Sequence, residues 1–392
     1  MNLVQHRKHR KHRKHRKLAA LAMIGLSLTA AGCGNANNNA GDAAAATASE
    51  TAASSAGTSS SPASSAPAAS PSASAAASPA AGNGETLTVY LNDFDDIVKP
   101  MFEAQTGYKL NIVSGNGAEI MSRIEAEKGN PHWDVVWMDA MPSIEGLGKQ
   151  GQLLEGWEPA AAAGLTDFAK TFVPASKAYY PTGAHAAGVI VYNTKSFSAA
   201  DAPKSWADLA DAKYKGTVGM ADPAVAAPAY PFVSWFFQDK GIEGGQSYFD
   251  SVLKNGAHVY PKNPNVAKAL TGGEIKVAAL QESNAYALKN GGEPIEIVWP
   301  EEGAPASVRV AAIQKDSQHQ EAAKAFVEFL LDPKTQQALI DQGDESYFEP
   351  SVAGVTVKAD RAQNAKLVVA EASWAADHEA EIKQWFADRS VK

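Results

Sequence analysis

The chain has 392 residues, of which 45% are hydrophobic, with one cysteine and a formal net charge of −8. Residues 1–32 carry eight Lys and Arg and no acidic residue, so the rest of the chain holds 27 of the 35 basic residues, all 43 acidic ones and a net charge of −16. This acidic remainder argues against nucleic acid as a partner and against peripheral binding to anionic lipid, because both need a basic face.

The first 32 residues have the pattern of a bacterial secretory signal peptide. A basic block at 7–17 is followed by an apolar segment at 18–32, which is shorter than the about 20 residues that span a bilayer. Cys33 comes directly after the small residues that end this segment. We therefore expect removal of 1–32, acylation of Cys33 and an extracytoplasmic protein anchored to the cell membrane by lipid. The alternative is a chance cysteine after an ordinary signal peptide.

The segment 33–84 is predicted to be the lipidated cysteine and a disordered tether. It consists mainly of Ala, Ser, Pro, Thr, Gly and Asn, with no aromatic residue and only two charges, Asp42 and Glu50. Such a stretch buries too little apolar surface to offset the entropy lost on ordering.

From Glu85 onwards, strand-like runs alternate with amphipathic segments, which is typical of an α/β fold with largely parallel sheets. The remaining residues exceed the usual size of one core, so we expect two lobes. Strands are predicted near 87–91, 110–113, 134–137, 187–192, 217–220, 257–260, 276–280, 295–299 and 308–313. Helices are predicted at 95–106, 118–128, 247–254, 266–270, 282–289, 318–331, 333–342 and 359–387.

Three turns that follow predicted strands carry candidate ligand-binding residues. Ligands of such folds bind beyond the carboxyl ends of the strands. One of these turns contains Ser114, Gly115, Asn116 and Gly117. Its hydroxyl, its flexible glycines and the helix that begins there favour an anion site, and the alternative is an ordinary turn with a helix cap. Polar groups after the first strand are expected to face the cleft at Asn92 and Asp93. An aromatic residue with a carboxylate could bind a cation or amine at Trp137 and Asp139, although Trp137 could equally belong to the core.

Three pairs of segments and one closing helix resemble the solute-binding proteins of bacterial ABC importers, in the branch with iron(III)-, phosphonate- or organophosphate-, thiamine- and polyamine-binding members. They are Leu87–Tyr90 with Phe102–Leu110, Ser122–Pro131 with Asp134–Trp137, Pro203–Leu209 with Tyr214–Pro223, and the closing helix Ala322–Gln336. The resemblance covers nearly all of 85–392.

This resemblance implies a two-lobed, type II periplasmic-binding-protein-like fold with two crossover strands. Lobe 1 would comprise 85–190 and 305–392, and lobe 2 would comprise 191–304, with crossings at 192–193 and 304–308. A small molecule or ion would bind between the lobes, and an ABC permease would receive it. We expect no cofactor and a monomer.

The resemblance also implies ligand contacts in the second lobe, where this chain departs from its relatives. Phosphorus-binding members often have Ser-Gly-Thr where this chain has Ala226, Ala227 and Pro228, so the hydroxyls are missing. Iron(III) members often have adjacent tyrosines near a turn that here contains Glu282, Asn284 and Tyr286, with one phenol. Ferric iron or a small phosphonate or organophosphate anion is favoured, with a polyamine or thiamine as the alternative.

No enzyme motif is visible in the sequence. His-Glu-x-x-His, Gly-x-Ser-x-Gly and the phosphate-binding Gly-x-x-x-x-Gly-Lys are all missing. A secreted hydrolase on an α/β scaffold and a sensory binding protein without a permease remain as alternatives.

Overall fold

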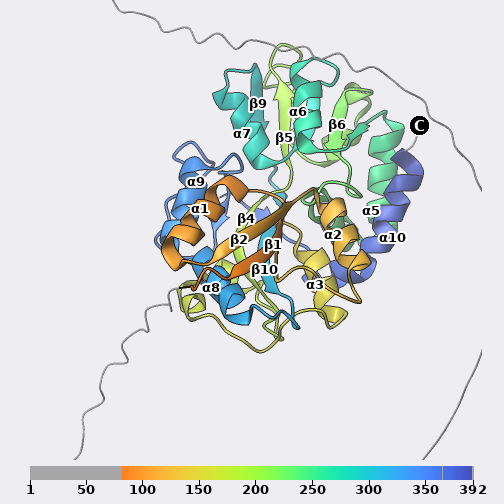
Figure 1. The fold of residues 1–392 in the computed structure, drawn as a ribbon. Coiled ribbons are helices and arrows are strands. Elements are labelled where there is room, and N and C mark those ends of the chain that lie inside the picture. The colour runs from red at the N-terminus through yellow and green to blue at the C-terminus, as the bar shows by residue number, and fades with distance from the viewer. Residues whose placement is uncertain (1–81, 364, 391–392) are drawn as a thin grey trace, which may run out of the picture. The chain divides into compact units, whose positions relative to one another are not determined.

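The computed structural model describes residues 82–363 and 365–390, which form two α/β lobes (Figure 1). The predicted signal peptide, Cys33 and all of the tether before residue 82 lie outside the described residues. Within the described part, no helix combines the length and apolar character needed to cross a bilayer.

The first lobe is built on a seven-stranded mixed sheet in the order β11-β4-β10-β3-β1-β2, with β12 paired to β10. β1 is parallel to β2 and β3, whereas β10 is antiparallel to β3 and β4. The sheet is therefore mixed where a largely parallel one was expected. Its strands are β1 (Thr86–Leu91), β2 (Lys109–Ser114), β3 (Val135–Met138), β4 (Tyr179–Ala186), β10 (Ala304–Ile313), β11 (Glu349–Pro350) and β12 (Leu367–Val368).

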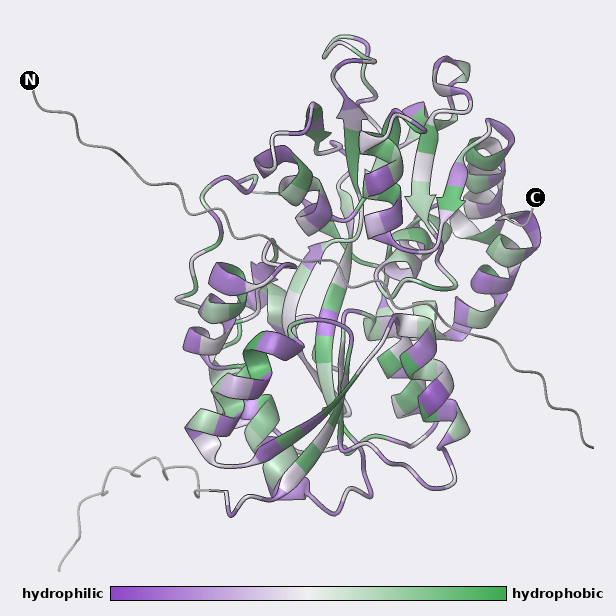
Figure 2. Cartoon of the chain, turned by 45° about the horizontal axis from the view of Figure 1, so that its top comes forward, coloured by the Kyte–Doolittle hydropathy of each residue, from purple (hydrophilic) through white to green (hydrophobic). Residues whose placement is uncertain are grey.

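Helices cover both faces of this sheet. One apolar cluster contains Phe102 and Phe326, from α1 and α8, and the other contains Ile120 and Ile144, from α2 and α3. Figure 2 shows the hydrophobic strands between helices that present hydrophilic residues outwards. The helices of this lobe are α1 (Asp95–Thr106), α2 (Gly117–Ala126), α3 (Met141–Lys149), α4 (Asp167–Lys170), α8 (Gln320–Leu330) and α9 (Pro333–Gln342), with the 3-10 turn η1 (Ala160–Gly164).

The second lobe has a five-stranded sheet in the order β7-β6-β8-β5-β9. It is also mixed, because β5 is antiparallel to β8 and β9. Its strands are β5 (Val189–Asn193), β6 (Val218–Ala221), β7 (His258–Tyr260), β8 (Val277–Leu280) and β9 (Ile295–Val298). Its helical segments are η2 (Ala207–Ala210), η3 (Ala212–Tyr214), α5 (Ala229–Lys254), α6 (Asn263–Thr271) and α7 (Glu282–Asn290).

Two segments join the lobes, as expected, but the first crossing lies earlier than expected. β4 pairs in the first sheet up to Ala186, and β5 begins the second sheet at Val189. Tyr192 and Asn193 lie inside the second sheet, opposite Glu296 and Ile295, and cannot be the crossing. The return crossing lies between β9 and β10, next to the expected 304–308.

The last helix, α10 (Ala372–Ser390), contacts both lobes, although 305–392 was expected to belong to lobe 1. Its Phe386 and Trp385 join the aromatic core of the second lobe, where Phe386 lies 4.9 Å from Phe249 between ring centroids. Its Glu379 accepts a hydrogen bond from Ser143 of α3 in the first lobe. The helix begins later than the predicted 359–387, because the chain before it crosses the surface as a loop that contains β12.

Replacing Phe386 with alanine should lower the free energy of unfolding by about 3–5 kcal/mol, because it leaves a cavity in a fully buried aromatic cluster. Denaturant unfolding of this variant, beside Gln384→Ala at an exposed position of the same helix, measures the effect. Equal stability of the two variants would contradict the placement of α10 in this core.

Candidate functional site

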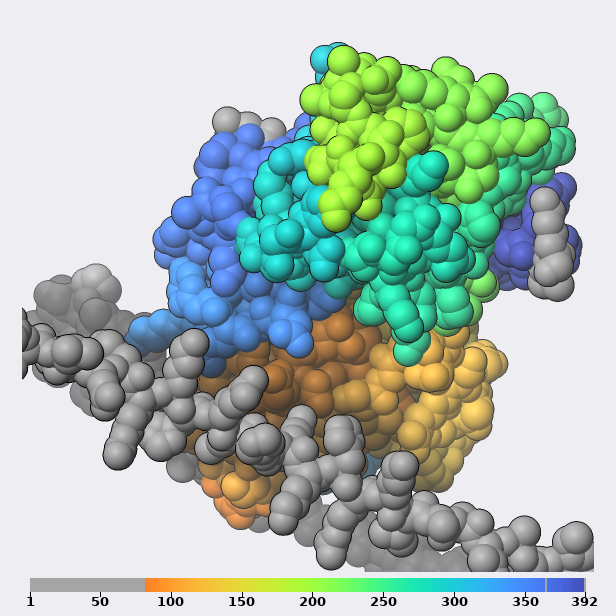
Figure 3. All heavy atoms as spheres, turned by 90° about the horizontal axis from the view of Figure 1, so that it is seen from above, coloured from red at the N-terminus to blue at the C-terminus, as the bar shows by residue number. Residues whose placement is uncertain are grey.

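A cavity of about 370 Å³ lies between the lobes. Seen from above, the green and teal atoms of the second lobe lie against the orange and blue atoms of the first (Figure 3). The walls of the cavity come mainly from turns that follow β1, β2 and β3 in the first lobe and β6, β7 and β8 in the second. This agrees with the expectation that ligands of such folds bind beyond the carboxyl ends of the strands. The size of the cavity is at the lower end of the range for ligand pockets, so it suits a small solute.

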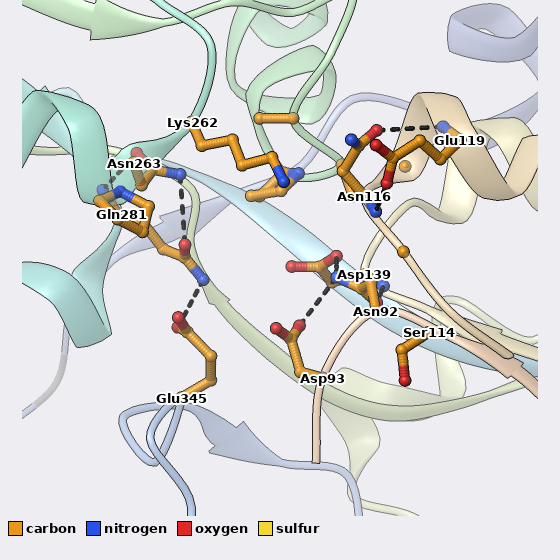
Figure 4. A pocket seen from close by; sticks show the side chains of 16 residues that line it. Asn92, Asp93, Ser114, Asn116, Glu119, Asp139, Lys262, Asn263, Gln281 and Glu345 are labelled. Atoms are coloured by element: carbon orange, nitrogen blue, oxygen red, sulfur yellow. Dashed lines mark hydrogen bonds between the residues drawn. The ribbon is translucent and has the colours of Figure 1, made fainter. Parts of the chain in front are cut away.

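Most of the residues singled out from the sequence line this one cavity. Those that do are Asn92, Asp93, Ser114, Gly115, Asn116, Gly117, Asp139, Ala226 and Ala227. They are joined by residues that were not singled out, namely Glu119, Pro228, Lys262, Asn263, Pro264, Gln281 and Glu345. Figure 4 shows these side chains around the open space.

Trp137 lies in the core rather than in the cavity wall. It is fully buried, its indole Nε1 donates to Thr182 Oγ1 at 2.8 Å, and its ring stacks near Phe94 at 5.8 Å. The Arg309 guanidinium lies over the same ring at 5.2 Å. Trp137 therefore packs against Arg309, which in turn contacts residues that line the cavity.

The predicted second-lobe residues Glu282 and Tyr286 also lie outside the cavity. Glu282 is fully buried and pairs with Arg361, whose Nε lies 2.5 Å from Oε1. Tyr286 stacks on Tyr347 at 4.2 Å. Both are occupied with contacts to the segment that follows α9, so they link the lobes instead of facing a ligand. Asn284 reaches only the edge of the site, where its side-chain amide lies 3.5 Å from Glu345 Oε1.

The first-lobe side of the cavity is a cluster of carboxylates around one buried arginine. Arg309, from the middle of β10, donates to Asn92 Oδ1 at 2.9 Å and to Asp93, and lies 3.6 Å from Asp139 Oδ2. Asn92 also donates to Asp139 Oδ1 at 2.5 Å. One arginine thus holds two carboxylates in place beneath the cavity, within a low-dielectric surrounding that strengthens these interactions.

Two of the acidic groups of this cluster are shifted towards their neutral form. Burial, outweighing the nearby Arg309, raises the pKa of Asp93 to about 6. Burial and then the charges of Asp93 and Asp139 raise the pKa of Glu345 to about 8. Burial lowers the pKa of the enclosed His185 to about 4, so this imidazole is neutral at pH 7. The cluster contains more carboxylates than cations.

One oxygen of this cluster, Asp139 Oδ2, accepts no hydrogen bond from the described residues, although His185 Nε2 lies 3.4 Å and an Arg309 nitrogen 3.6 Å from it. Asp139 itself is 1% exposed. A buried carboxylate oxygen without a donor is costly, and an ammonium group in the cavity would supply one.

The second-lobe side of the cavity has the opposite character. The positive ends of the α5 and α6 dipoles point towards it, and neither helix has a side-chain cap. Lys262, which precedes α6, extends into the cavity from the side opposite to Asp93 and Glu345 (Figure 4). This side suits an anionic group.

The predicted anion site at the start of α2 lines the cavity, and part of this turn is a helix cap, which was the alternative interpretation of the same residues. Asn116 and Glu119 form a capping box, in which Asn116 Oδ1 accepts from the Glu119 amide at 3.0 Å and Glu119 Oε2 accepts from the Asn116 amide at 2.8 Å. The capping box therefore satisfies the amides of Asn116 and Glu119 at this helix start. The Asn-x-x-Glu spacing was the visible sequence signal for this cap.

The residues that sequence reasoning missed had signals of different strength. Lys262, Asn263 and Gln281 follow strands and open helices, so the same rule that selected the other turns could have found them. Arg309 is a lone charge in the buried ten-residue strand β10, which is itself unusual. Glu345 lies in the loop after α9 and has no local signal.

Comparison with known proteins identifies the class of this chain. The family of bacterial extracellular solute-binding proteins matches residues 149–369, and the chain belongs to this family. It is therefore a receptor of a bacterial ABC importer, as the resemblance predicted, and not an enzyme. Such receptors act outside the cytoplasm, where they bind a small ligand and deliver it to an ABC permease.

Individual relatives carry different ligand names. One relative is a "Putative 2-aminoethylphosphonate-binding periplasmic protein" of Salmonella paratyphi A, to which the chain is 27% identical over 243 residues. The aligned part covers 60% of this chain and 68% of that relative. Another relative is the major ferric iron-binding protein of Neisseria meningitidis serogroup B, to which the chain is 27% identical over 277 residues. The aligned part covers 68% of this chain and 82% of that relative. The solved structure of the periplasmic binding protein AfuA from Actinobacillus pleuropneumoniae, with fructose-6-phosphate bound, matches 79% of this chain and all of that chain with a TM-score of 0.70 and 21% identity. This structural match confirms the two-lobed fold.

Replacing Arg309 with methionine should lower the free energy of unfolding by about 3–5 kcal/mol at pH 8, because it leaves Asp93 and Asp139 without their buried cation. The loss should be smaller at pH 5, where Asp93, with its pKa raised to about 6, can take up a proton. Arg123→Met, which removes an exposed ion pair, is the control and should change stability by about 1 kcal/mol or less. A loss for Arg309→Met that does not depend on pH would show that the arginine acts through packing alone.

Proposed function

We propose that this receptor captures a small zwitterionic solute of the aminoalkylphosphonate class. The observation that carries the proposal is the opposite charge of the two cavity walls. The first lobe offers Asp139 and Asp93, and the second offers Lys262 with the positive ends of α5 and α6. A solute with an ammonium group at one end and a phosphonate at the other would satisfy both walls at once. The aminoethylphosphonate name of one relative is consistent with this ligand class.

Binding would then favour closure of the cleft. A ligand shifts a two-lobed protein to the closed form only through contacts that are better in that form, and a zwitterion held by both lobes has such contacts. The lobes already touch across the cavity in this structure, where the Ala118 amide donates to the Val225 carbonyl at 3.4 Å. Gly117 packs on Ala227 next to this bond.

The other ligands considered from the sequence have less support. No tyrosine lines the cavity, and the described residues contain no group of three His, Cys, Asp or Glu side chains arranged to hold a metal ion, which disfavours ferric iron. A polyamine or thiamine would suit the acidic wall of the first lobe but would be repelled by the positive charge of Lys262 on the wall of the second lobe. The acidic wall makes a purely cationic solute the second candidate.

We further propose that the receptor is a monomer anchored to the membrane through an acylated Cys33. The cysteine follows a signal-like segment, and no other thiol is available in the chain. The net negative charge of the remainder gives no attraction to anionic lipid or nucleic acid.

Titration calorimetry of 2-aminoethylphosphonate, ethylphosphonate, putrescine and ferric citrate tests the ligand class. We expect 2-aminoethylphosphonate to bind at least about tenfold more tightly than ethylphosphonate, because the latter leaves the buried Asp139 oxygen without a donor. Tighter binding of putrescine would favour the cationic class, and binding of ferric citrate alone would contradict the proposal.

Replacing Gly117 with alanine should weaken solute binding by about 1–3 kcal/mol while leaving the lobes folded. A Cβ at this position would lie 2.8 Å from Ala227 Cα, so the lobes could not approach as closely. Gly129→Ala is the control, since its added Cβ would meet no atom within 4 Å. Unchanged affinity of Gly117→Ala would show that this contact does not belong to the binding form.

Replacing Cys33 with alanine should release the protein from the membrane fraction or leave it unprocessed. Fractionation of cells followed by mass determination of the mature N-terminus measures this. A variant that still fractionates with membranes as a lipidated species would refute the anchor.

A further inference from the structure

Glu345 occupies an unusual position for a carboxylate. It lies in the loop after α9 of the first lobe and lines the interlobe cavity. Behind it is a small void of about 10 Å³, which is bordered by the apolar side chains of Phe94, Leu339 and Phe348 and by the polar ones of Thr182, His185 and Arg309. A void of this size holds about one water molecule at most, so the carboxyl group has little solvent on that side.

Glu345 also joins the two lobes. Its Oε2 accepts a hydrogen bond from Gln281 Nε2 at 2.8 Å, and Gln281 immediately precedes α7 of the second lobe. The same Gln281 amide lies 3.2 Å from His185 Nε2 of the first lobe. Closure of the cleft therefore encloses Glu345 further, because the hydrogen-bond partner and the covering residues come from the other lobe.

The charged and titratable groups that face Glu345 leave it without a cation of its own. Asp93 from the turn after β1 and Asp139 from the end of β3 are like charges. Arg309 of β10 is already bound to Asp93 and Asn92. His185 of β4 is neutral because burial lowers its pKa. The α7 start contributes only the neutral Gln281, Ser283 and Asn284.

The remaining cation of the cavity does not neutralise Glu345. Lys262 forms no ion pair with any residue in the described ranges, and Figure 4 shows it entering from the opposite side of the cavity. Next to it, Asn263 is neutral and hydrogen-bonded to Gln281.

We propose that Glu345 selects for the cationic group of the solute and that it releases a proton to solvent when this group binds. This inference rests on the proposed zwitterionic ligand. Without ligand, the carboxyl group holds its proton, because it is buried beside the carboxylates of Asp93 and Asp139 and these effects outweigh the charge of Arg309. The incoming ammonium group supplies the missing cation, so the O–H bond breaks, the proton passes to buffer, and a carboxylate–ammonium pair forms. The raised pKa of Glu345, to about 8, agrees with a protonated acid near pH 7.

The direction of the pH dependence follows from this exchange. A group that loses a proton on binding makes the affinity rise with pH, up to the pKa of the ligand-free group. Affinity for an amine-bearing ligand should therefore increase by more than about tenfold from pH 6 to pH 8. A ligand without the amine should not show this increase.

Titration calorimetry in buffers of different ionisation enthalpy measures the protons released. For 2-aminoethylphosphonate at pH 7, we expect the unaltered protein to release more than about half a proton per ligand bound. Glu345→Gln keeps the size of the side chain and its oxygen acceptor but removes the acidic proton. The variant should therefore release fewer protons per ligand bound and lose the rise in affinity with pH. Its affinity should approach that of the unaltered protein at pH 6 and fall below it at pH 8. Ethylphosphonate reports any proton that comes from the phosphonate group.

The possible failures can be told apart. If 2-aminoethylphosphonate binds without proton release, or if Glu345→Gln releases as many protons as the unaltered protein, the role of Glu345 is refuted while the ligand class stands. If 2-aminoethylphosphonate does not bind at all, the ligand class fails and this inference fails with it. The measurements on the unaltered protein decide the question even where the variant folds poorly.

Discussion

The site depends on one buried arginine beneath an excess of carboxylates. Arg309 is 5% exposed, and its guanidinium lies over the rings of Phe94 and Trp137 while it binds Asn92 and Asp93. Buried carboxylates would otherwise have to take up protons or reach water, because isolated charges are unstable in a low-dielectric interior. The arginine permits part of this acidic wall to exist, and the part that it does not neutralise is available to a ligand.

The division of charge between the lobes links binding to closure. The first lobe contributes most of the carboxylates of the cavity wall, and the second contributes Lys262 and the N-termini of α5 and α6. A ligand of one sign is attracted by one wall and opposed by the other, whereas a zwitterion gains from both only when they approach each other. Specificity and conformational change then have the same physical origin, since the closed form is the one in which both ends of the solute are satisfied.

The sequence predicted the fold and most of the turns that line the cavity, because both follow from local patterns. The helix at 95–106 has the predicted bounds, since acidic residues open it and Gly107 ends it in the left-handed conformation with φ 79°. The turns at Asn92 and Ser114 could be placed in one cavity because they follow strands of one sheet. Trp137 was ambiguous, as its strand is buried on both faces. Glu345 could not have been found, because its place depends on how a distant loop folds back between the lobes.

The most direct measurement of the central claim is a crystal structure of the receptor with 2-aminoethylphosphonate bound. The account predicts one orientation, with the ammonium nitrogen about 3 Å from Asp139 Oδ2 and the phosphonate beside Lys262 at the starts of α5 and α6. The reverse orientation, with the phosphonate against the first lobe, or a ligand that contacts only one lobe, would contradict the assignment of charge to the two walls.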